Sequence, residues 1–351
     1  MESDYQHIQQ QVLDAYHEAK HLNIYGMNSK AFYGLPVTGQ ELDMSGYKGI
    51  SHYEPTELFI TAKAGTSLLE IEETLAKSGQ QLAFEPPRFN NKGSIGGAVA
   101  AGLSGPARPY TGSLRDFVLG ISCINGKGHC LNFGGQVMKN VAGYDVSRLL
   151  SGSLGTLAIL LEVTLKVLPE PKYEASCEKK MSLASARKFL RELKTKSALL
   201  SGAVYDGEHL RLRFSGNRNA IDEAMNFIQF DTFDNSEWWE LLRDHQHDFF
   251  QSDKNIWRLS IPFNSEPKFI EENFLMDWGG TQYWIASNKA EEEMFELARN
   301  YGGHATLFYD KKNTQKRFQP LSNELLNIHK RMKQAFDPKF ILNPGKMYAE
   351  L

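Results

Sequence analysis

A short glycine-containing segment near the amino terminus carries residue types that could bind an anion. Gly26-Met27-Asn28-Ser29-Lys30 follows a predicted strand at residues 23–25. Small residues let backbone N–H groups approach a diphosphate, while Ser29 and Lys30 add a hydroxyl donor and a positive charge. Taken alone, however, the segment is better explained as an ordinary turn, because short motifs of this kind recur by chance.

A second glycine-rich segment, Gly93-Ser94-Ile95-Gly96-Gly97, precedes an alanine-rich stretch at residues 98–101. The pattern predicts the start of a helix whose exposed N–H groups would form an anion site. It is equally compatible with a tightly packed, buried helix where only small side chains fit. Both interpretations predict the same helix, and this segment alone does not separate them.

A third segment, over residues 134–157, is long and again rich in glycine. It begins with Gly134-Gly135-Gln136 and ends with Ser153-Leu154-Gly155-Thr156-Leu157. A loop of this length is typical of a functional segment, although it could also be a plain connection.

Common nucleotide and metal signatures are absent from the sequence. Gly126-Lys127-Gly128 begins like a dinucleotide fingerprint, but residue 131 is leucine, and no P-loop spacing is present. The three cysteines form no CxxC pair, so we expect no iron–sulfur cluster or zinc held by this chain alone. His17-Glu18-Ala19-Lys20-His21 matches a zinc-protease pattern, but no further ligand signature follows and we interpret it as coincidence.

Charge and hydropathy exclude two classes of partner. The 351-residue chain has a net charge of −3 with acids and bases interspersed, and no basic cluster adjoins an aromatic platform, so a nucleic-acid partner is not expected. The amino terminus lacks a signal peptide, and the most apolar stretch, residues 157–168, is too short to span a bilayer. We expect a cytoplasmic protein whose contact with the inner membrane, if any, comes through partners.

The elements expected around these segments define a first domain over residues 1–170. An amphipathic helix is predicted at 5–21, and the capping box Ser67-Leu68-Leu69-Glu70 predicts a second helix to about residue 77. Strands are predicted at 58–61, 117–124, 128–133 and 157–168, the last with strict alternation. Pro169-Glu170-Pro171 then predicts a domain boundary.

The remainder of the chain has a different organisation. Helices alternate with short strands over residues 171–335, an order that suggests a ferredoxin-like α+β domain. The last residues, 336–351, are rich in Pro and Gly and predict an ordered tail that returns to the first domain.

Taken in order, these segments resemble the FAD-binding domain of the vanillyl-alcohol oxidase and p-cresol methylhydroxylase family, and most closely its glycolate oxidase FAD-binding (E) subunits. The resemblance is dense over residues 20–170 and sparse beyond. A series of motifs in order is far more specific than any single one. The motifs are Tyr53-Glu54-Pro55, Ala64-Gly65-Thr66, Gly79-Gln80, Phe84-Glu85-Pro86-Pro87, 94–102, Gly105-Pro106-Ala107-Arg108, 115–120, 133–145, Phe336-Asp337-Pro338 and Leu342-Asn343-Pro344-Gly345-Lys346.

The resemblance implies an α+β fold, with a two-part FAD-binding domain of vanillyl-alcohol oxidase type and a ferredoxin-like substrate or cap domain. It implies that residues 26–30 hold the FAD diphosphate, that 94–97 lie on its other side, and that 155–159 flank the adenine or ribityl part. The cofactor-binding residues expected are Gly26, Met27, Asn28, Ser29, Lys30, Pro87, Ser94, Ile95, Gly96, Gly97, Arg115, Asp116, Gly155, Leu157, Ile159 and Asn343.

Two departures from the family pattern refine these expectations. Some relatives attach FAD covalently through a histidine in the first turn, where this chain has Asn28, so we expect non-covalent FAD. Related 2-hydroxy-acid dehydrogenases carry a metal-binding histidine cluster in the substrate half. This chain has only Gly302-Gly303-His304-Ala305 there, so we expect no metal.

The resemblance leaves three functions open. In the favoured one, the chain is the FAD-binding subunit of a glycolate oxidase complex, passing flavin electrons toward an iron–sulfur subunit beside a separate catalytic flavoprotein subunit. In the second, the chain alone oxidises a small 2-hydroxy acid, with Arg108, Arg115 or Lys139 binding its carboxylate and His304 as the base. Each of these side chains could equally be structural. The third is an assembly subunit that has lost flavin chemistry.

Overall fold

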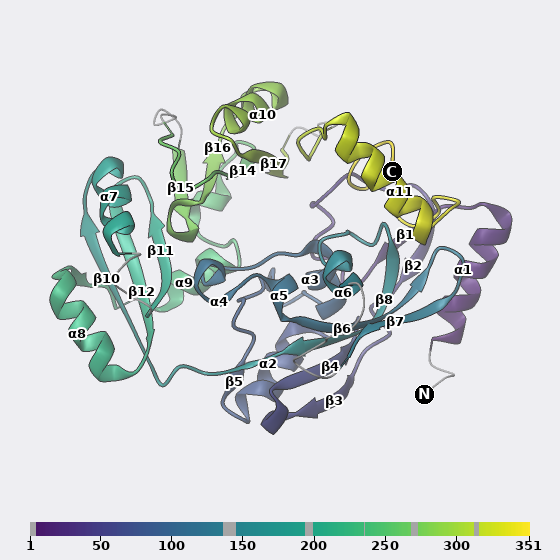
Figure 1. The fold of residues 1–351 in the computed structure, drawn as a ribbon, viewed down its shortest axis with the longest axis horizontal. Coiled ribbons are helices and arrows are strands. Elements are labelled where there is room, and N and C mark those ends of the chain that lie inside the picture. The colour runs from purple at the N-terminus through teal and green to yellow at the C-terminus, as the bar shows by residue number, and fades with distance from the viewer. Residues whose placement is uncertain (1–4, 136–144, 194–198, 235, 268–272, 312–315) are drawn as a thin grey trace. The chain divides into compact units, whose positions relative to one another are not determined.

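The computed structural model describes residues 5–135, 145–193, 199–234, 236–267, 273–311 and 316–351. The chain forms two compact units (Figure 1). Unit 1 combines residues 1–104, 113–169 and 320–351, and unit 2 combines residues 105–112 and 170–319. The domain boundary predicted from the sequence would put residues 105–112 in the first domain and 320–335 in the second. In the structure, residues 105–112 belong to unit 2 and residues 320–335 belong to unit 1.

Most of residues 320–335 form helix α11 (Asn323–Phe336), which belongs to unit 1. Its side chain Lys333 is buried and donates to the backbone carbonyls of Thr156 and Leu342, both in unit 1. A local sequence pattern predicts that a helix forms but not which surface it packs on, so the sequence around residues 320–335 does not indicate that α11 packs on unit 1.

The central element of unit 1 is a five-stranded antiparallel sheet in the order β3-β4-β8-β6-β7. Its strands are β3 (Ile50–Glu54), β4 (Phe59–Lys63), β6 (Val118–Asn125), β7 (Cys130–Gly134) and β8 (Ala158–Lys166). A parallel pair, β1 (Leu22–Tyr25) with β2 (Gln40–Asp43), and a short pair, β5 (Gln80–Gln81) with β9 (Leu168–Pro169), lie beside it.

Both faces of this sheet are covered by apolar clusters. Helices α2 (Leu68–Ala76), α3 (Ile95–Ala101), α5 (Leu114–Phe117) and α6 (Val146–Leu150) pack into one cluster. Helix α1 (Gln6–Glu18), the β1–β2 pair and the tail residues Ile341 and Leu342 form the other. The helix predicted from the capping box is confirmed, because the Ser67 hydroxyl accepts from the N–H of Glu70 at 3.0 Å.

Strand β8 departs from the regular alternation that its sequence predicts. Its partners on β6 shift between Ser122 and Cys123, so that one strand carries an extra residue at this point. Ile159 and Leu161 lie in the cluster with α1, whereas Val163 and Leu165 lie in the cluster with α2 and α3. A bulge moves the following side chains to the opposite face of a sheet, which accounts for the change.

Unit 2 is built on an eight-stranded sheet in the order β13-β10-β12-β11-β15-β16-β14-β17. The first half is β10 (Tyr173–Lys180), α7 (Leu183–Leu193), β11 (Leu200–Tyr205), β12 (His209–Gly216), α8 (Arg218–Ile228) and β13 (Asp231–Thr232). The second half is β14 (Ile256–Ser260), β15 (Asn273–Asp277), β16 (Gln282–Ala286), α10 (Glu291–Asn300) and β17 (His304–Tyr309).

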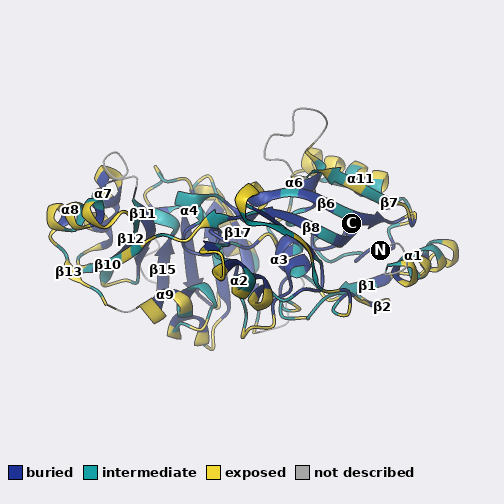
Figure 2. Cartoon of the chain, turned by 90° about the horizontal axis from the view of Figure 1, so that it is seen from below, coloured by how far each residue is buried: buried dark blue, intermediate teal, exposed yellow. Residues whose placement is uncertain are grey.

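The ferredoxin-like expectation is confirmed in the first half, and the same strand order recurs in the second half, where the described residues include no helix between β14 and β15. Numbered within each half, the strands lie in the order 4-1-3-2 and then 2-3-1-4, and every pairing is antiparallel. The halves join through a single pair, Tyr205 with Met276. Helices α7, α8 and α10 contribute to one apolar cluster with the sheet. Figure 2 shows exposed residues along helix α8 of unit 2 and along helix α11 of unit 1.

The opposite face of this sheet is covered by α9 (Ser236–Arg243) and a 3-10 turn (Asp248–Gln251). The sequence predicted one helix over residues 238–249, and the chain instead turns at His245, whose φ is +57°. The aromatic side chains of this layer, Trp238, Trp239, Phe249 and Phe250, are buried. The small helix α4 (Arg108–Thr111) also belongs to unit 2.

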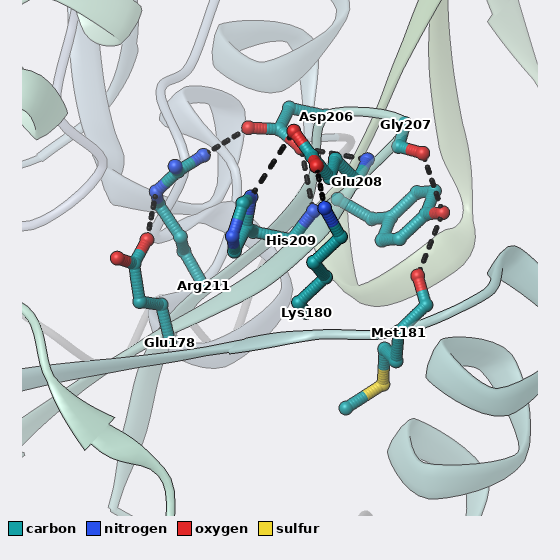
Figure 3. A network of polar contacts seen from close by, with 9 residues as sticks. Glu178, Lys180, Met181, Asp206, Gly207, Glu208, His209 and Arg211 are labelled. Atoms are coloured by element: carbon teal, nitrogen blue, oxygen red, sulfur yellow. Dashed lines mark hydrogen bonds and ion pairs between the residues drawn. The ribbon is translucent and has the colours of Figure 1, made fainter.

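A polar network closes the turn between β11 and β12 (Figure 3). The carboxylate of Asp206 accepts from the N–H groups of Glu208 and His209 and from the guanidinium of Arg211. Arg211 also pairs with Glu178 on the neighbouring strand β10 at 2.9 Å. The network therefore ties three consecutive strands of the sheet together at one end.

Candidate cofactor-binding site

Two adjoining pockets lie in unit 1 where β1 ends and α3 begins. They enclose about 480 and 520 Å³ of space, open solvent included. Segments near residues 25, 95, 155 and 343 meet there although they are far apart in the chain. Both pockets are lined by Ile24, Tyr25, Gly26, Ser94, Gly97, Ala100, Leu154 and Asn343.

The fold gathers most of the residues that the sequence analysis expected to bind the cofactor. Those that line one or both pockets are Gly26, Met27, Asn28, Ser29, Lys30, Ser94, Gly96, Gly97, Gly155, Ile159 and Asn343. Five expected residues line neither pocket: Pro87, Ile95, Arg115, Asp116 and Leu157.

The positions of two of these five have clear structural reasons. Ile95 is fully buried in the core between the sheet and α3. Asp116 caps α5, because its carboxylate accepts from the N–H of Ser113 at 3.0 Å and from the Ser113 hydroxyl at 2.6 Å. Its neighbour Arg115 is exposed on the same short helix.

The first turn approaches α3 closely. A Cβ added to Gly26 would come within 2.8 Å of the Ser94 hydroxyl oxygen, a distance that real Cβ atoms do not reach. Asn28 adopts φ of +57°, a conformation that asparagine tolerates better than most residues. The absence of a side chain at Gly26 therefore allows the backbone of this turn to lie close to Ser94.

The N–H groups at the start of α3 are not free, in contrast to the expectation of an exposed helix N-terminus. Ile95 N donates to Thr66 O at 2.9 Å and Gly96 N donates to Ala64 O at 2.8 Å. Gly97 N donates to the Ser94 hydroxyl at 3.3 Å. A Cβ on Gly96 would lie 2.6 Å from the Ala64 side chain, so close packing explains Gly96. Gly97, by contrast, lies next to the amine of Lys30, because a Cβ added to Gly97 would lie 3.9 Å from Lys30 Nζ.

Lys30 is the principal charge in the pockets. Burial lowers the pKa of its amine to about 8. Its Nζ donates to the Ser29 hydroxyl at 3.3 Å and lies 5.3 Å from the Phe89 ring centroid. Within the described ranges no carboxylate forms an ion pair with it. A partly buried cation without a carboxylate counter-charge fits an anionic group such as a diphosphate.

Lys346 lines the second pocket, although the sequence did not indicate it as a cofactor-binding residue. It lines the second pocket together with Ser29 and Lys30, and burial lowers its pKa as well. Its motif was recognised as the closing segment of the family. Only the fold brings residues 30 and 346 to one site, so no local signal could have paired them.

Asn343 links two walls of the pockets. Its Oδ1 accepts from Ile24 N at 2.7 Å, and its Nδ2 donates to Leu154 O at 2.8 Å and to Ile24 O at 3.2 Å. A Cβ on Gly155 would lie 2.9 Å from that Nδ2. The side chain is therefore fixed between β1 and the loop that precedes β8.

Two of the candidate catalytic residues, Arg108 and His304, lie in unit 2, whereas Arg115 lies in unit 1. The guanidinium of Arg108 stacks on Trp278, with 4.2 Å between its Cζ and the ring centroid. Trp278 in turn donates from Nε1 to Gly105 O at 3.0 Å. His304 begins β17 opposite Ser260, and desolvation together with the charge of Arg258 lowers its pKa. Lys139 lies outside the described residues.

The zinc-protease pattern near the amino terminus is not arranged as its spacing suggested. Helix α1 ends at Glu18, and Ala19 adopts a left-handed conformation, so His17 and His21 do not share a helical face. Across the described ranges, no group of three or more His, Cys, Asp or Glu residues is arranged to hold a metal ion. No helix in the same ranges is long and apolar enough to cross a membrane.

Two family models match parts of this chain. Residues 3–134 match the FAD binding domain family, and residues 273–347 match the C-terminal domain of FAD linked oxidases. The first match contains the turn at 26–30 and the start of α3, and the second contains Asn343 and Lys346.

Individual relatives extend the comparison to the whole chain. Glycolate oxidase subunit GlcE of Escherichia coli is 42% identical over 351 residues, which cover 100% of this chain and 99% of that protein. D-lactate dehydrogenase of Archaeoglobus fulgidus is 31% identical over 30% of this chain and 24% of that protein. Glycolate oxidase subunit GlcD of Bacillus subtilis is 32% identical over 32% of this chain and 24% of that protein.

A solved structure with the same fold is alkyldihydroxyacetonephosphate synthase. It superposes with a TM-score of 0.67 over 96% of this chain and 73% of that chain, at 16% sequence identity. At this identity the similarity concerns the fold alone.

Proposed function

Because this chain belongs to the family of the glycolate oxidase subunit GlcE, we propose that it is the FAD-binding subunit of a glycolate oxidase complex that passes flavin electrons toward an iron–sulfur partner subunit. Its cofactor is FAD, as the FAD binding domain match requires. We propose that the complex also contains a separate catalytic flavoprotein subunit. We place the complex in the cytoplasm, where only the partner subunits would contact the inner membrane.

One observation carries the placement of the cofactor. Lys30 lies partly buried beside Gly97 and Ser29, where desolvation lowers its pKa to about 8, in a pocket that Lys346 also lines. An anion bound beside these two partly buried lysines would offset the cost of desolvating their charge. The diphosphate of FAD has that charge, so residues 26–30 and Lys346 would hold it.

The residues of the chain then act by binding and orientation. FAD, when bound, supplies the hydride and electron transfer of the reaction. Lys30 and Lys346 would neutralise the diphosphate, and the apolar wall of Ala100, Leu154 and Ile159 would exclude water from the rest of the cofactor. Asn28 stands where some relatives have a histidine, which supports non-covalent attachment.

The test begins with the visible spectrum of the purified chain, before and after acid precipitation. A yellow supernatant is expected, because non-covalent FAD is released when the protein unfolds. A yellow pellet would contradict the argument from Asn28. A colourless protein that does not take up added FAD would instead support an assembly subunit without flavin chemistry.

A second experiment separates the subunit from a self-sufficient 2-hydroxy-acid dehydrogenase. The chain alone, loaded with FAD, is mixed anaerobically with glycolate or D-lactate, and the same mixture is repeated with the partner subunits. We expect rapid flavin bleaching only with the partners. If the chain alone bleaches at a catalytic rate, the self-sufficient enzyme is correct, and Arg108→Met and His304→Gln then test the proposed carboxylate site and base.

A further inference from the structure

A buried ion pair connects α11 to the carboxyl-terminal segment. Lys333 and Asp337 are 1% and 0% exposed, and Lys333 Nζ lies 2.8 Å from Asp337 Oδ2. The remaining protons of Lys333 go to the carbonyls of Thr156 and Leu342, each at 2.7 Å. All three donors of the ammonium group are therefore used, as a buried charge requires.

The carboxylate of this pair fixes the chain that follows it. Asp337 Oδ1 accepts from Ile341 N at 3.1 Å, and Oδ2 accepts from Leu342 N at 2.8 Å. Ile341 O in turn accepts from Leu22 N at 2.7 Å, at the start of β1. The pair thus sets the path of residues 341–342 and joins it to both the loop at Thr156 and the strand that leads into the first turn.

The next residue in this path is the pocket residue Asn343. Its side chain bridges Ile24 and Leu154, which lie on two walls of the cofactor pocket. Neither Lys333 nor Asp337 lines that pocket. Any influence of the pair on the cofactor must therefore pass through the backbone that it holds, at residues 341–343 and at Thr156 beside the pocket residue Gly155.

We propose that Lys333 and Asp337 are positioning residues that hold the carboxyl-terminal segment so that Asn343 and Lys346 complete the FAD site. This inference rests on the assignment of the pocket to FAD. A buried ion pair contributes little net stability compared with apolar residues of the same size. Its effect here is to direct charged donors and acceptors to four backbone groups, at Thr156, Ile341 and Leu342.

The experiment compares single and double variants of the purified full chain without FAD. Asp337→Asn leaves Lys333 buried without a counter-charge, so this variant should lose stability against urea. Lys333→Met combined with Asp337→Asn removes both charges and should regain part of that stability. FAD affinity is measured for each by quenching of flavin fluorescence, with no turnover required.

If the ion pair positions the carboxyl-terminal segment, the double variant should behave differently than if the pair only stabilises the fold. We expect its FAD affinity to stay about tenfold or more below that of the unchanged chain, because the bonds to Thr156, Ile341 and Leu342 remain weakened. Recovery of affinity together with stability would overturn the proposal. Failure of the unchanged chain to bind FAD would instead contradict the proposed function, so the two failures are distinguishable.

A matched control is available in unit 2. Arg317 and Asp310 form another ion pair of low exposure, 10% and 0%, at 3.1 Å. Asp310→Asn should lower stability while FAD affinity stays unchanged, and an equal loss of affinity would argue against a specific role for Lys333 and Asp337. Hydrogen exchange on the unchanged chain gives a second measurement. FAD should slow exchange of the amides of Leu342 and Asn343, and no change there would also overturn the proposal.

Discussion

Gly126 lies directly against the carboxylate of Asp337, and a Cβ added to Gly126 would come within 2.3 Å of Oδ1. The N–H of Gly126 also donates to Phe336 O at 3.0 Å. The turn between β6 and β7 is therefore in contact with the buried pair at the end of α11. This contact provides a way to displace Asp337 without changing any charge.

Gly126→Ala is expected to destabilise unit 1 by about 1–3 kcal/mol, the usual cost of adding a methyl group to a close-packed site. Because the methyl group pushes on Asp337, FAD affinity should fall as well. Gly46→Ala is the control, since its Cβ would meet no atom within 4 Å. Urea unfolding and FAD titration of both variants check this, and unchanged values for Gly126→Ala would contradict the packing described.

The charge of Lys30 predicts how FAD binding depends on pH. Its pKa in the folded chain is about 8, below the ordinary value of 10.5, because the amine is buried. A bound diphosphate favours the protonated form, so FAD affinity should be constant below pH 8 and fall as the pH rises through it. The fall is at most about tenfold per pH unit for one proton.

Substitutions at Lys30 test that assignment. Lys30→Met should weaken FAD binding by roughly 1.5–3 kcal/mol, the range for hydrogen bonds to charged groups, and reduce the pH dependence. Lys30→Arg keeps the charge to high pH, so its affinity should vary less above pH 8. FAD titrations at a series of pH values measure both. If FAD affinity depends on pH in the same way in Lys30→Met, a group other than Lys30 is responsible for the pH dependence.

The same residue affects the chain without FAD in the opposite direction. Since the folded pKa of Lys30 is below the unfolded value, the unfolded chain binds more protons between about pH 8 and 10.5. Stability without FAD therefore gains from this group as the pH rises through that window. Urea midpoints for the unchanged chain and for Lys30→Met, measured at about pH 7.5, below this window, and at about pH 9.5, inside it, should converge as the pH rises.

Lys346 provides a test of the carboxyl-terminal segment itself. Lys346→Gln should weaken FAD binding, because the side chain lines the pocket beside Lys30. Lys339→Gln is the matched control in the same segment, since Lys339 is exposed and donates to Tyr16 O at 2.6 Å. Equal FAD affinities for the two variants would show that Lys346 does not contribute to the site.

The site was predictable where its residues are close in sequence. The turn at 26–30 and the segment at 94–97 did not indicate a cofactor site on their own, and they were assigned to one because they occur in order within a series of family motifs. Asn343 was found only through its motif. Lys346 was not chosen, because nothing near position 346 indicates that residue 30 lies beside it.

The fold was predictable in its order of elements but not in its packing. Alternating helices and strands indicated a ferredoxin-like arrangement, but the join between Tyr205 and Met276 depends on edge strands that carry no distinctive residues. Lys333 resembles a surface lysine on an amphipathic helix. Only the fold shows that Asp337, Thr156 and Leu342 surround its amine.

The network around Asp206 predicts the acid sensitivity of unit 2 (Figure 3). Burial acts to raise the pKa of this carboxyl, but hydrogen bonds from the His209 N–H, Arg211 and the Glu208 N–H together hold it below its ordinary value. The charged form is therefore favoured by folding. Its contribution is present above the unfolded pKa of 3.8 and is lost as the pH falls through the lower folded value.

Asp206→Asn should remove that contribution and leave Arg211 with Glu178 as its carboxylate partner at 2.9 Å. We expect a loss of about 1–3 kcal/mol near neutral pH, the cost of leaving a partly buried charged donor without its acceptor, and a smaller difference from the unchanged chain in acid. Asp231→Asn on the exposed strand β13 is the control. Urea midpoints of the three proteins at neutral pH and near pH 3, below the ordinary carboxyl pKa, measure this. A difference that stays constant with pH would mean that Asp206 stabilises the turn by shape and not by charge.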